Sequence, residues 1–330
     1  MSKTQSSNLS WRPSRRDVLF LGIGGMLAAV PIARRRPTSL VRRNVPVMGT
    51  IAEFAVAHDD AAKAHAAIDA AIRALQEVDE TMSRFRPLSD VGRANLQAAR
   101  VPTIVGPSTA EVLSASLRWA EESGGAFDPC LGRAITLWDI GHRHQPPAAG
   151  EITRVAGRAL YRSLEVGSSA GRPAVIFHDD DVKVDLGGIA KGYGVDRAVA
   201  ALREHGIEHA LVGAGGDLYA LGRSPAGEPW HVGIQSPDRP DALAGSLYLE
   251  NQAVATSGDY QQYFEYRNRR YHHLLDPETG EPRLTPRRSV SVVAETCMDA
   301  DAGATLAFVG EPSLAGRVLA RRGGRIAHSI

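Results

Sequence analysis

The chain has 330 residues, of which 43% are hydrophobic and 23% charged, and its formal net charge is +1. This length and composition are those of a globular protein with a full core, and they exclude a disordered chain. The two cysteines, Cys130 and Cys297, are too few for a disulfide framework.

The first 36 residues differ from the rest of the chain. Arg15 and Arg16 precede an apolar run over residues 18–33, and three more arginines follow at positions 34–36. The run is shorter than the about 20 residues that a membrane-spanning helix needs, and paired arginines before such a run are typical of twin-arginine export. We therefore expect an export signal at residues 1–36, a linker at 37–46 and a periplasmic protein, with inner-membrane association as an option. An uncleaved signal anchor is the alternative.

Removal of the signal would change the charge of the chain. Residues 1–36 contain seven of the 38 basic residues and one of the 37 acidic residues, which leaves 31 basic against 36 acidic residues and a net charge of −5. A surplus of acidic side chains argues against nucleic acid as a partner.

Beyond the linker, a strand and two long helices are expected. Residues 51–56 are dense in apolar side chains, and residues 59–82 repeat them at every third or fourth position, the pattern of a helix that faces a core. A second helix is expected to begin at Ser108, its N-cap, with Glu111 in capping-box register, and to end at Gly124. Phe127 and Asp128 then precede a proline, where Asp128 can present its carboxylate; a structural Asx turn is the alternative.

Residues 184–197 carry the clearest chemical signal. A short strand ends near Asp185, two glycines follow at 187 and 188, and a helix is expected to begin near Ile189 and end at Gly206. Backbone N–H groups at a glycine turn and a helix N-terminus bind phosphate well, and Lys191 adds a positive charge. A turn that only solves a packing problem is the structural alternative.

The chain after this helix predicts mainly antiparallel strands. Short apolar segments at 210–212, 217–221, 230–234 and 246–249 indicate a meander, and residues 263–266 and 271–275 indicate a hairpin. The glycine-rich residues 213–216 fit either a tight hairpin or a close approach to a ligand. His272 and His273 are neighbours on a strand, so they face opposite sides and only one can face a site. A strand at 289–293 and a helix at 298–309 follow.

The last of these helices carries a second informative spacing. Asp301 and Thr305 are one turn apart and share a face, and a carboxylate with a hydroxyl suits a hard cation that also binds phosphate oxygens, as Mg²⁺ does. The alternative is that Asp301 only stabilises the helix dipole.

Taken in chain order, these segments resemble the FAD:protein FMN transferase (ApbE) family from Val47 to Gly310. The matching blocks are residues 48–50, 83–86, 126–129, 185–192, 215–217, 256–260, 273–280 and 300–305. The resemblance implies an α+β fold, with antiparallel sheets flanked by helices, in a two-lobed ApbE-like (T-fold-like) architecture. It assigns residues 47–330 to one flavin transferase domain of two interleaved lobes, with the site in the crevice between them.

The resemblance also implies an activity and its residues. Such an enzyme cleaves FAD, moves FMN onto a Thr or Ser hydroxyl of an acceptor flavoprotein and releases AMP with the help of Mg²⁺. In that pattern Asp301 and Thr305 bind the metal through side chains and Ala190 through its carbonyl, His273 is the catalytic base and Asp301 a further catalytic residue. The positions that would line the FAD site are Met48, Phe85, Ala126, Phe127, Asp128, Asp185, Lys191 and Leu274.

Other functions stay open at this point. A Mg²⁺-dependent FAD pyrophosphatase would use the same residues with water in place of the hydroxyl, and an accessory protein would bind FAD without turnover. A dinucleotide-dependent dehydrogenase is a weaker option, because the two glycines are not part of a G-x-G-x-x-G run. The resemblance also implies that the acceptor is a membrane-associated redox subunit. Cys130 departs from the family pattern, in which a threonine follows Phe-Asp-Pro.

Overall fold

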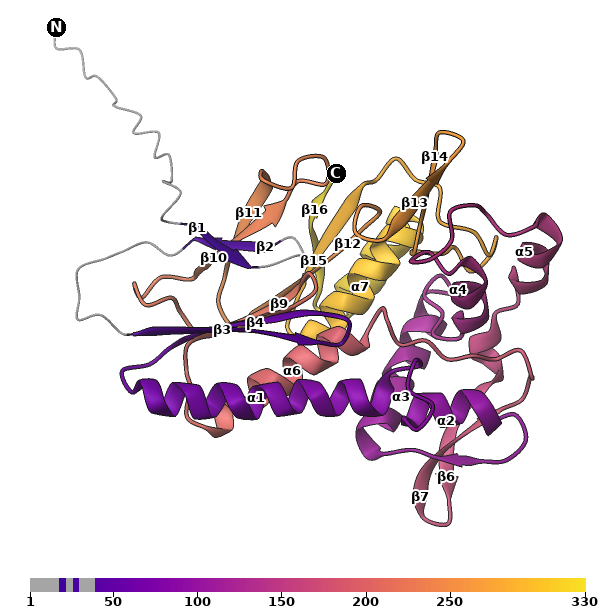
Figure 1. The fold of residues 1–330 in the computed structure, drawn as a ribbon, viewed down its shortest axis with the longest axis horizontal. Helices are drawn as coiled ribbons and strands as arrows, with labels where there is room; N and C mark the ends of the chain where they lie inside the picture. The colour runs from indigo at the N-terminus through magenta and orange to yellow at the C-terminus, as the bar shows by residue number, and fades with distance from the viewer. Residues whose placement is uncertain (1–17, 22–25, 30–38) are drawn as a thin grey trace, which may run out of the picture.

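A seven-stranded antiparallel sheet forms the centre of the molecule (Figure 1). The computed structural model of the chain describes residues 18–21, 26–29 and 39–330. The strands of this sheet are, in spatial order, β16 (Arg325–Ser329), β15 (Ser289–Ala294), β12 (Gln252–Gly258), β9 (Asp217–Leu221), β8 (Ala210–Ala214), β4 (Thr50–Ala57) and β3 (Leu40–Val47). Every neighbouring pair in it is antiparallel.

The edge strand β3 corrects the expected linker at residues 37–46. It pairs with β4 over its whole length, from Leu40 opposite Ala57 to Val47 opposite Thr50. Arg42, Asn44 and Pro46 alternate outward, which is the period of a strand. Basic side chains and a proline are tolerated because an edge strand has one side without partners in the sheet, and there they discourage pairing with other chains.

Three helices cover one face of the seven-stranded sheet, and the sequence predicted a helix at each of these three places. Asp60 caps the first by accepting bonds from the N–H groups of Ala62 and Lys63. The three helices are α1 (Ala61–Met82), α6 (Ala190–Glu204) and α7 (Cys297–Val309). Helix α6 lies in the middle and contacts both α1 and α7.

A smaller sheet covers the opposite face. Its strands β10 (Trp230–Gln235) and β11 (Leu243–Leu249) pack against the central sheet through a separate apolar cluster that includes Trp230, Leu211 and Val254. Two short strands of the N-terminal apolar run, β1 (Val18–Leu21) and β2 (Met26–Ala29), extend this sheet along β10. The paired arginines at positions 15 and 16 and those at 34–36 lie outside the described residues. No helix in the described part of the chain is long and apolar enough to cross a membrane.

Residues 83–186 form a second, mostly helical region beside the sheet (Figure 1). Its first long helix begins at Pro107 with Gly106 as N-cap, so the expected cap at Ser108 is wrong. Glu111 is no capping-box partner either, because its carboxylate accepts the hydroxyl of Tyr193 at 3.1 Å. The elements are α2 (Asp90–Gln97), β5 (Thr103–Ile104), α3 (Pro107–Glu122), α4 (Gly132–Trp138), α5 (Ala149–Val155), a 3₁₀ turn (Leu160–Ser163), β6 (Leu164–Ser169) and β7 (Arg172–Phe177).

The hairpin of β13 (Tyr263–Tyr266) and β14 (Arg269–His272) stands apart from the central sheet. It packs on α4 and α5 through a small cluster in which Tyr271 lies between Trp138 and Phe264 at ring distances of 5.6 and 5.1 Å. The last helix, α8 (Pro312–Arg321), leads into the edge strand β16 and was not predicted from the sequence.

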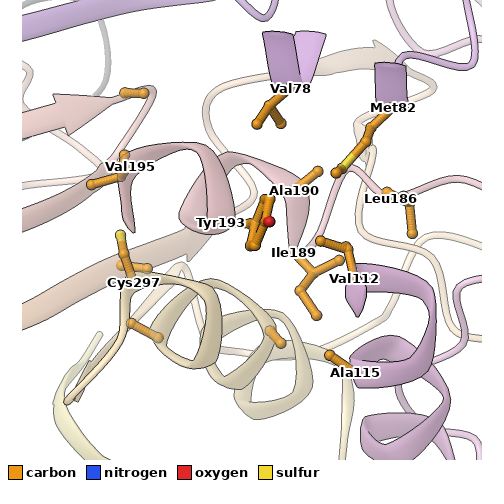
Figure 2. Packing of buried hydrophobic residues seen from close by; sticks show 14 of the residues in the cluster. Val78, Met82, Val112, Ala115, Leu186, Ile189, Ala190, Tyr193, Val195 and Cys297 are labelled. Carbon is orange, nitrogen blue, oxygen red and sulfur yellow. The ribbon is translucent and has the colours of Figure 1, made fainter. Parts of the chain in front are cut away.

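One continuous apolar cluster joins the helical region to the central sheet. It includes Val78 and Met82 of α1, Val112 of α3 and Ile189 at the start of α6. Figure 2 shows these side chains gathered around the first turn of α6, with Cys297 of α7 on its other side. The expected α+β class is confirmed, and the start of α6 is held by three other helices at once.

Candidate active site

The first turn of α6 lies directly against α7, although more than a hundred residues separate the two segments in sequence. A Cβ atom on Gly188 would lie 3.0 Å from the Thr305 hydroxyl oxygen and 3.3 Å from its methyl carbon. Lys191 reaches Asp301, with its Nζ atom 3.1 Å from each carboxylate oxygen. The glycine turn, Lys191, Asp301 and Thr305 therefore lie close together.

Gly192 explains how the two helices can approach so closely. A Cβ atom at this position would lie 2.2 Å from the carbonyl oxygen of Cys297 and 2.8 Å from the Cα atom of Met298, so only glycine fits. One turn further along α6, Asp196 accepts the N–H groups of Cys297 and Met298 at 2.8 Å each. This carboxylate satisfies donors at the N-terminus of α7, which have no partner within their own helix.

Lys191 is shared by two buried carboxylates. Its Nζ atom lies 2.9 Å from Asp217 and 3.1 Å from Asp301, and both carboxylate residues are only 3% exposed. Burial alone would lower the pKa of the Lys191 ammonium, but the two carboxylates outweigh burial and raise it. Burial, together with the neighbouring Asp301, raises the pKa of Asp217. Such a group is stable only as a unit, because loss of one partner leaves a buried charge at a cost of about 3–5 kcal/mol.

Asp217 was not among the predicted site residues. It is the first residue of β9 and follows a two-residue turn of Gly215 and Gly216, whose φ angles are +59° and +99°. The hairpin expectation for residues 213–216 is therefore confirmed. Asp217 lies opposite Ala214 of β8 and Ala255 of β12, inside the sheet. Two sequence signals pointed to it: an acidic residue directly after a glycine turn at the start of an apolar strand, and its place in the family-like block at residues 215–217.

Apolar side chains surround this polar group. A Cβ atom on Gly188 would meet the ring of Phe127 at 3.4 Å, so Phe127 lies beside the glycine turn. The thioether sulfur of Met48 lies over α6, where a Cβ atom on Gly194 would meet it at 3.1 Å. Ala126 lies near the end of α7, and its Cβ atom is 3.6 Å from the place that a Cβ atom on Gly310 would take. All three predicted lining residues thus lie along α6 or α7.

Two further predicted residues meet at the other side of the glycine turn. The carboxylate of Asp185 forms an ion pair with Arg84 and accepts the N–H of Gly187 at 2.8 Å. The Arg84 guanidinium also lies 4.2 Å from the centre of the Phe85 ring, which is 78% exposed. Phe85 therefore presents its ring to solvent at the rim of the site.

Asp128 takes the structural role that was left open as an alternative. Its carboxylate accepts the N–H of Cys130 at 2.7 Å, which is an Asx turn. Burial raises its pKa to about 6, against the opposing effect of backbone hydrogen bonds from Cys130 and Tyr161. Cys130 and Cys297 are both buried free thiols.

The expected strand at residues 271–275 ends earlier, because β14 ends at His272 and His273 follows it. His272 is 5% exposed, contacts the edge of Phe308 at 5.4 Å between ring centres and bonds the carbonyl of Arg283. His273 is half-buried and lies within electrostatic range of Lys191. Burial, with smaller contributions from the nearby His272 and Lys191, lowers the pKa of His273 to about 4 against the opposing hydrogen bond to the Gln262 carbonyl.

The polar group at α6 and α7 has the donors that a hard cation needs. Asp301 offers a carboxylate, Thr305 a hydroxyl one turn further along α7, and Ala190 a carbonyl at the start of α6. Lys191 lies between the two buried carboxylates of Asp217 and Asp301. Within the described residues no three His, Cys, Asp or Glu side chains gather into a metal-binding cluster. A Mg²⁺ ion fits this set provided that hydroxyl, carbonyl and substrate oxygens complete its coordination.

Comparisons with known proteins place the chain in a family. The family model for the ApbE family matches residues 48–329. A FAD:protein FMN transferase of Treponema pallidum is 35% identical over 321 residues, covering 92% of this chain and 86% of the relative. One from Klebsiella pneumoniae is 32% identical over 281 residues, covering 84% of this chain and 80% of the relative.

Solved structures agree as well. The ApbE protein of Thermotoga maritima superposes with a TM-score of 0.79 at 29% identity, covering 87% of this chain and 93% of that one. The flavin transferase ApbE of Vibrio cholerae superposes with a TM-score of 0.74 at 28% identity, covering 89% and 97%. The chain therefore belongs to the ApbE family.

Proposed function

We propose that this protein transfers FMN from FAD to a Thr or Ser hydroxyl of an acceptor flavoprotein and releases AMP, with Mg²⁺ as its metal. One observation carries the proposal: the glycine turn at the start of α6 and the Asp301–Thr305 face of α7 lie side by side, joined by Lys191. Relatives that cover most of the chain bear the name of this activity.

The chain supplies charge neutralisation for the diphosphate of FAD. Backbone N–H groups at the start of α6 and the ammonium of Lys191 would bind its oxygens, while Phe127 and Met48 line the apolar side of the site. When bound at Asp301, Thr305 and the Ala190 carbonyl, Mg²⁺ would neutralise further negative charge on the diphosphate. Phosphoryl transfer gains most from such positioning and neutralisation.

His273 would act as the general base. Since its pKa is lowered to about 4, the imidazole is neutral near pH 7 and can accept a proton. The acceptor hydroxyl gives this proton to His273 and forms a bond from its oxygen to the FMN phosphorus. The bond from that phosphorus to the bridging oxygen breaks, and AMP leaves with the electron pair.

Incubation with FAD, Mg²⁺ and a co-expressed acceptor tests the proposal. A fluorescent acceptor band in a denaturing gel, with one AMP formed for each flavin bound, is the expected result. Free FMN together with AMP, and no labelled band, would favour the FAD pyrophosphatase. Tight FAD binding without AMP would favour an accessory protein.

We also propose export to the periplasm and an acceptor that is a membrane-associated redox subunit. The arginine pair before a short apolar run supports export. A reporter fused after residue 36 should reach the periplasm only in cells with a working twin-arginine translocase, and changing Arg15 and Arg16 to lysine should keep it in the cytoplasm. Export that is unaffected by these changes would contradict the twin-arginine route.

A further inference from the structure

The Lys191 ammonium has more acceptors than it has protons. Besides Asp217 at 2.9 Å and both oxygens of Asp301 at 3.1 Å, the Gly187 carbonyl lies 3.3 Å away. An ammonium has only three N–H donors, so these acceptors share them. Asp217 holds the shortest of the four contacts.

Asp301 faces a conflict when it binds a cation. It is the carboxylate of the proposed metal site, and it is also a partner of Lys191 and of the Gly192 N–H at 3.1 Å. A divalent cation on Asp301 would bring two positive groups onto one carboxylate in a buried place, where charges interact strongly. The ammonium then needs a second counter-charge that does not depend on Asp301.

Asp217 is placed to be that counter-charge. Its backbone is fixed between β8 and β12, directly after the turn of Gly215 and Gly216. Its side chain is almost fully buried, so it is shielded from water and held on the α6 side of the sheet. Groups that sit on rigid strands hold their partners more accurately than groups on loops.

We propose that Asp217 is a positioning residue of the flavin transfer: it holds the Lys191 ammonium beside Asp301 so that Asp301 stays available for the cation. This inference rests on the proposed function. Without the Asp217 charge, Lys191 has Asp301 as its only carboxylate partner in this group, and a cation must displace the ammonium before it can bind.

The test measures cation binding as well as activity. Mn²⁺ alone, titrated into flavin-free protein and followed by electron paramagnetic resonance, reports the metal site directly, and AMP release against Mg²⁺ concentration reports turnover. In Asp217→Asn, both half-saturating concentrations should rise by about 10- to 100-fold, the usual effect of removing a partner of a metal ligand. The rate at saturating Mg²⁺ should recover in large part.

Asp90→Asn is the matched control. Asp90 is also buried, at 8% exposure, but its carboxylate accepts the Gly106 N–H and the Thr109 hydroxyl in the helical region. Its replacement should lower the melting temperature and leave both half-saturating concentrations unchanged. If Asp217→Asn behaves in the same way, Asp217 is only structural and the inference is wrong.

A double variant separates positioning from direct metal binding. In a Lys191→Met background no ammonium competes for Asp301, so adding Asp217→Asn should change the Mn²⁺ half-saturation by less than about twofold, since Asp217 acts through Lys191. If Asp217→Asn weakens Mn²⁺ binding in this background as much as it does alone, Asp217 acts on the cation itself, which overturns the inference. So would the absence of saturable Mn²⁺ binding in the unsubstituted protein.

The same experiment keeps the inference apart from the proposed function. Unsubstituted protein that forms no AMP from FAD and Mg²⁺ contradicts the function. Unsubstituted protein that forms AMP, beside an Asp217→Asn variant with the same metal dependence, contradicts only the role of Asp217.

Discussion

The diphosphate end and the base end of the proposed active site are built in different ways. Lys191 and Asp301 lie on helices packed into the main core, and their charges are bonded to the sheet and to each other. His273 follows a two-stranded hairpin that rests on a separate cluster of six buried residues. The diphosphate end, which is packed into the main core, suits a substrate that is the same in every turnover. The base end, which has fewer buried neighbours, suits an incoming protein segment that has to enter and leave.

Replacement of His273 should slow FMN transfer without changing FAD binding at the diphosphate end. His273→Ala should lower FMN transfer by about 10²- to 10⁴-fold, the usual contribution of a general base. The FAD dissociation constant, measured by flavin fluorescence, should stay the same. His272→Gln is the control, since His272 faces the core and bonds the Arg283 carbonyl. It should lower the melting temperature and retain most of the transfer. Unchanged turnover of His273→Ala would remove His273 from the mechanism.

Replacement of Gly192 should instead disturb the packing of α6 against α7 at the diphosphate end. The new methyl group of Gly192→Ala would lie 2.2 Å from a backbone carbonyl of α7, so the helices must separate, at a cost of about 3 kcal/mol or more in free energy of unfolding. Urea unfolding measures this change, and FAD binding should weaken with it.

Gly316→Ala on α8 is the control for this prediction. No atom lies within 4 Å of the place that a Cβ atom on Gly316 would take, so the change should stabilise the protein by about 0.5–1 kcal/mol through helix propensity. Equal effects of the two alanines would show that α6 and α7 are not in such close contact.

Substitution of one tryptophan in each of two apolar clusters should have a smaller effect on stability. One cluster lies under the hairpin and the other on the far face of the central sheet. Trp138 donates its ring N–H to the Gly280 carbonyl at 2.6 Å beneath the hairpin, and Trp230 donates to the Leu221 carbonyl at 2.9 Å on the far face of the sheet. Either Trp→Phe variant should lose about 1–3 kcal/mol, because a buried acceptor is left without its donor.

The two tryptophan variants should differ in activity. Trp138→Phe should raise hydrogen exchange in the hairpin at residues 263–273 and slow transfer, with FAD binding unchanged. Trp230→Phe should do neither. Equal loss of transfer in both would mean that the hairpin is not an independent support for His273.

The lowered pKa of His273 should also appear in the pH dependence of stability. His273 has a pKa of about 4 in the folded protein, below its usual 6.5, so the unfolded chain binds the proton more tightly. This group therefore lowers stability as the pH falls from about 6.5 to 4 and has no such effect above that range. In His273→Gln, the difference between the free energies of unfolding at pH 7 and pH 4.5 should be smaller than in the unsubstituted protein. An equal difference would contradict the lowered pKa.

The sequence predicted the elements whose pattern is local. The apolar repeat predicted α1, and the glycine turn with Lys191 and the Asp301–Thr305 spacing singled out two segments that the structure brings together. The sequence of edge strand β3 resembles a linker because its arginines mask an alternation that becomes clear only in the pairing with β4.

Other features depend on contacts that the sequence does not display. Asp217 could not be placed, because its role comes from a hairpin that ends beside α6. Ser108 looked like a helix cap, but the helix begins one residue earlier at Pro107, where a proline loses no hydrogen bond. Asp128 had two possible roles, and the local Asx turn uses its carboxylate.

The stretch from Lys191 to Asp196 joins α6 to α7 in three different ways: by an ion pair, by backbone contact at Gly192 and by a shared helix cap. A substitution at any one of these positions shifts the other two, since all act across the same interface. Their energetic effects will therefore not add up in combination, and a family member that changes one of them is expected to carry a compensating change at its neighbours.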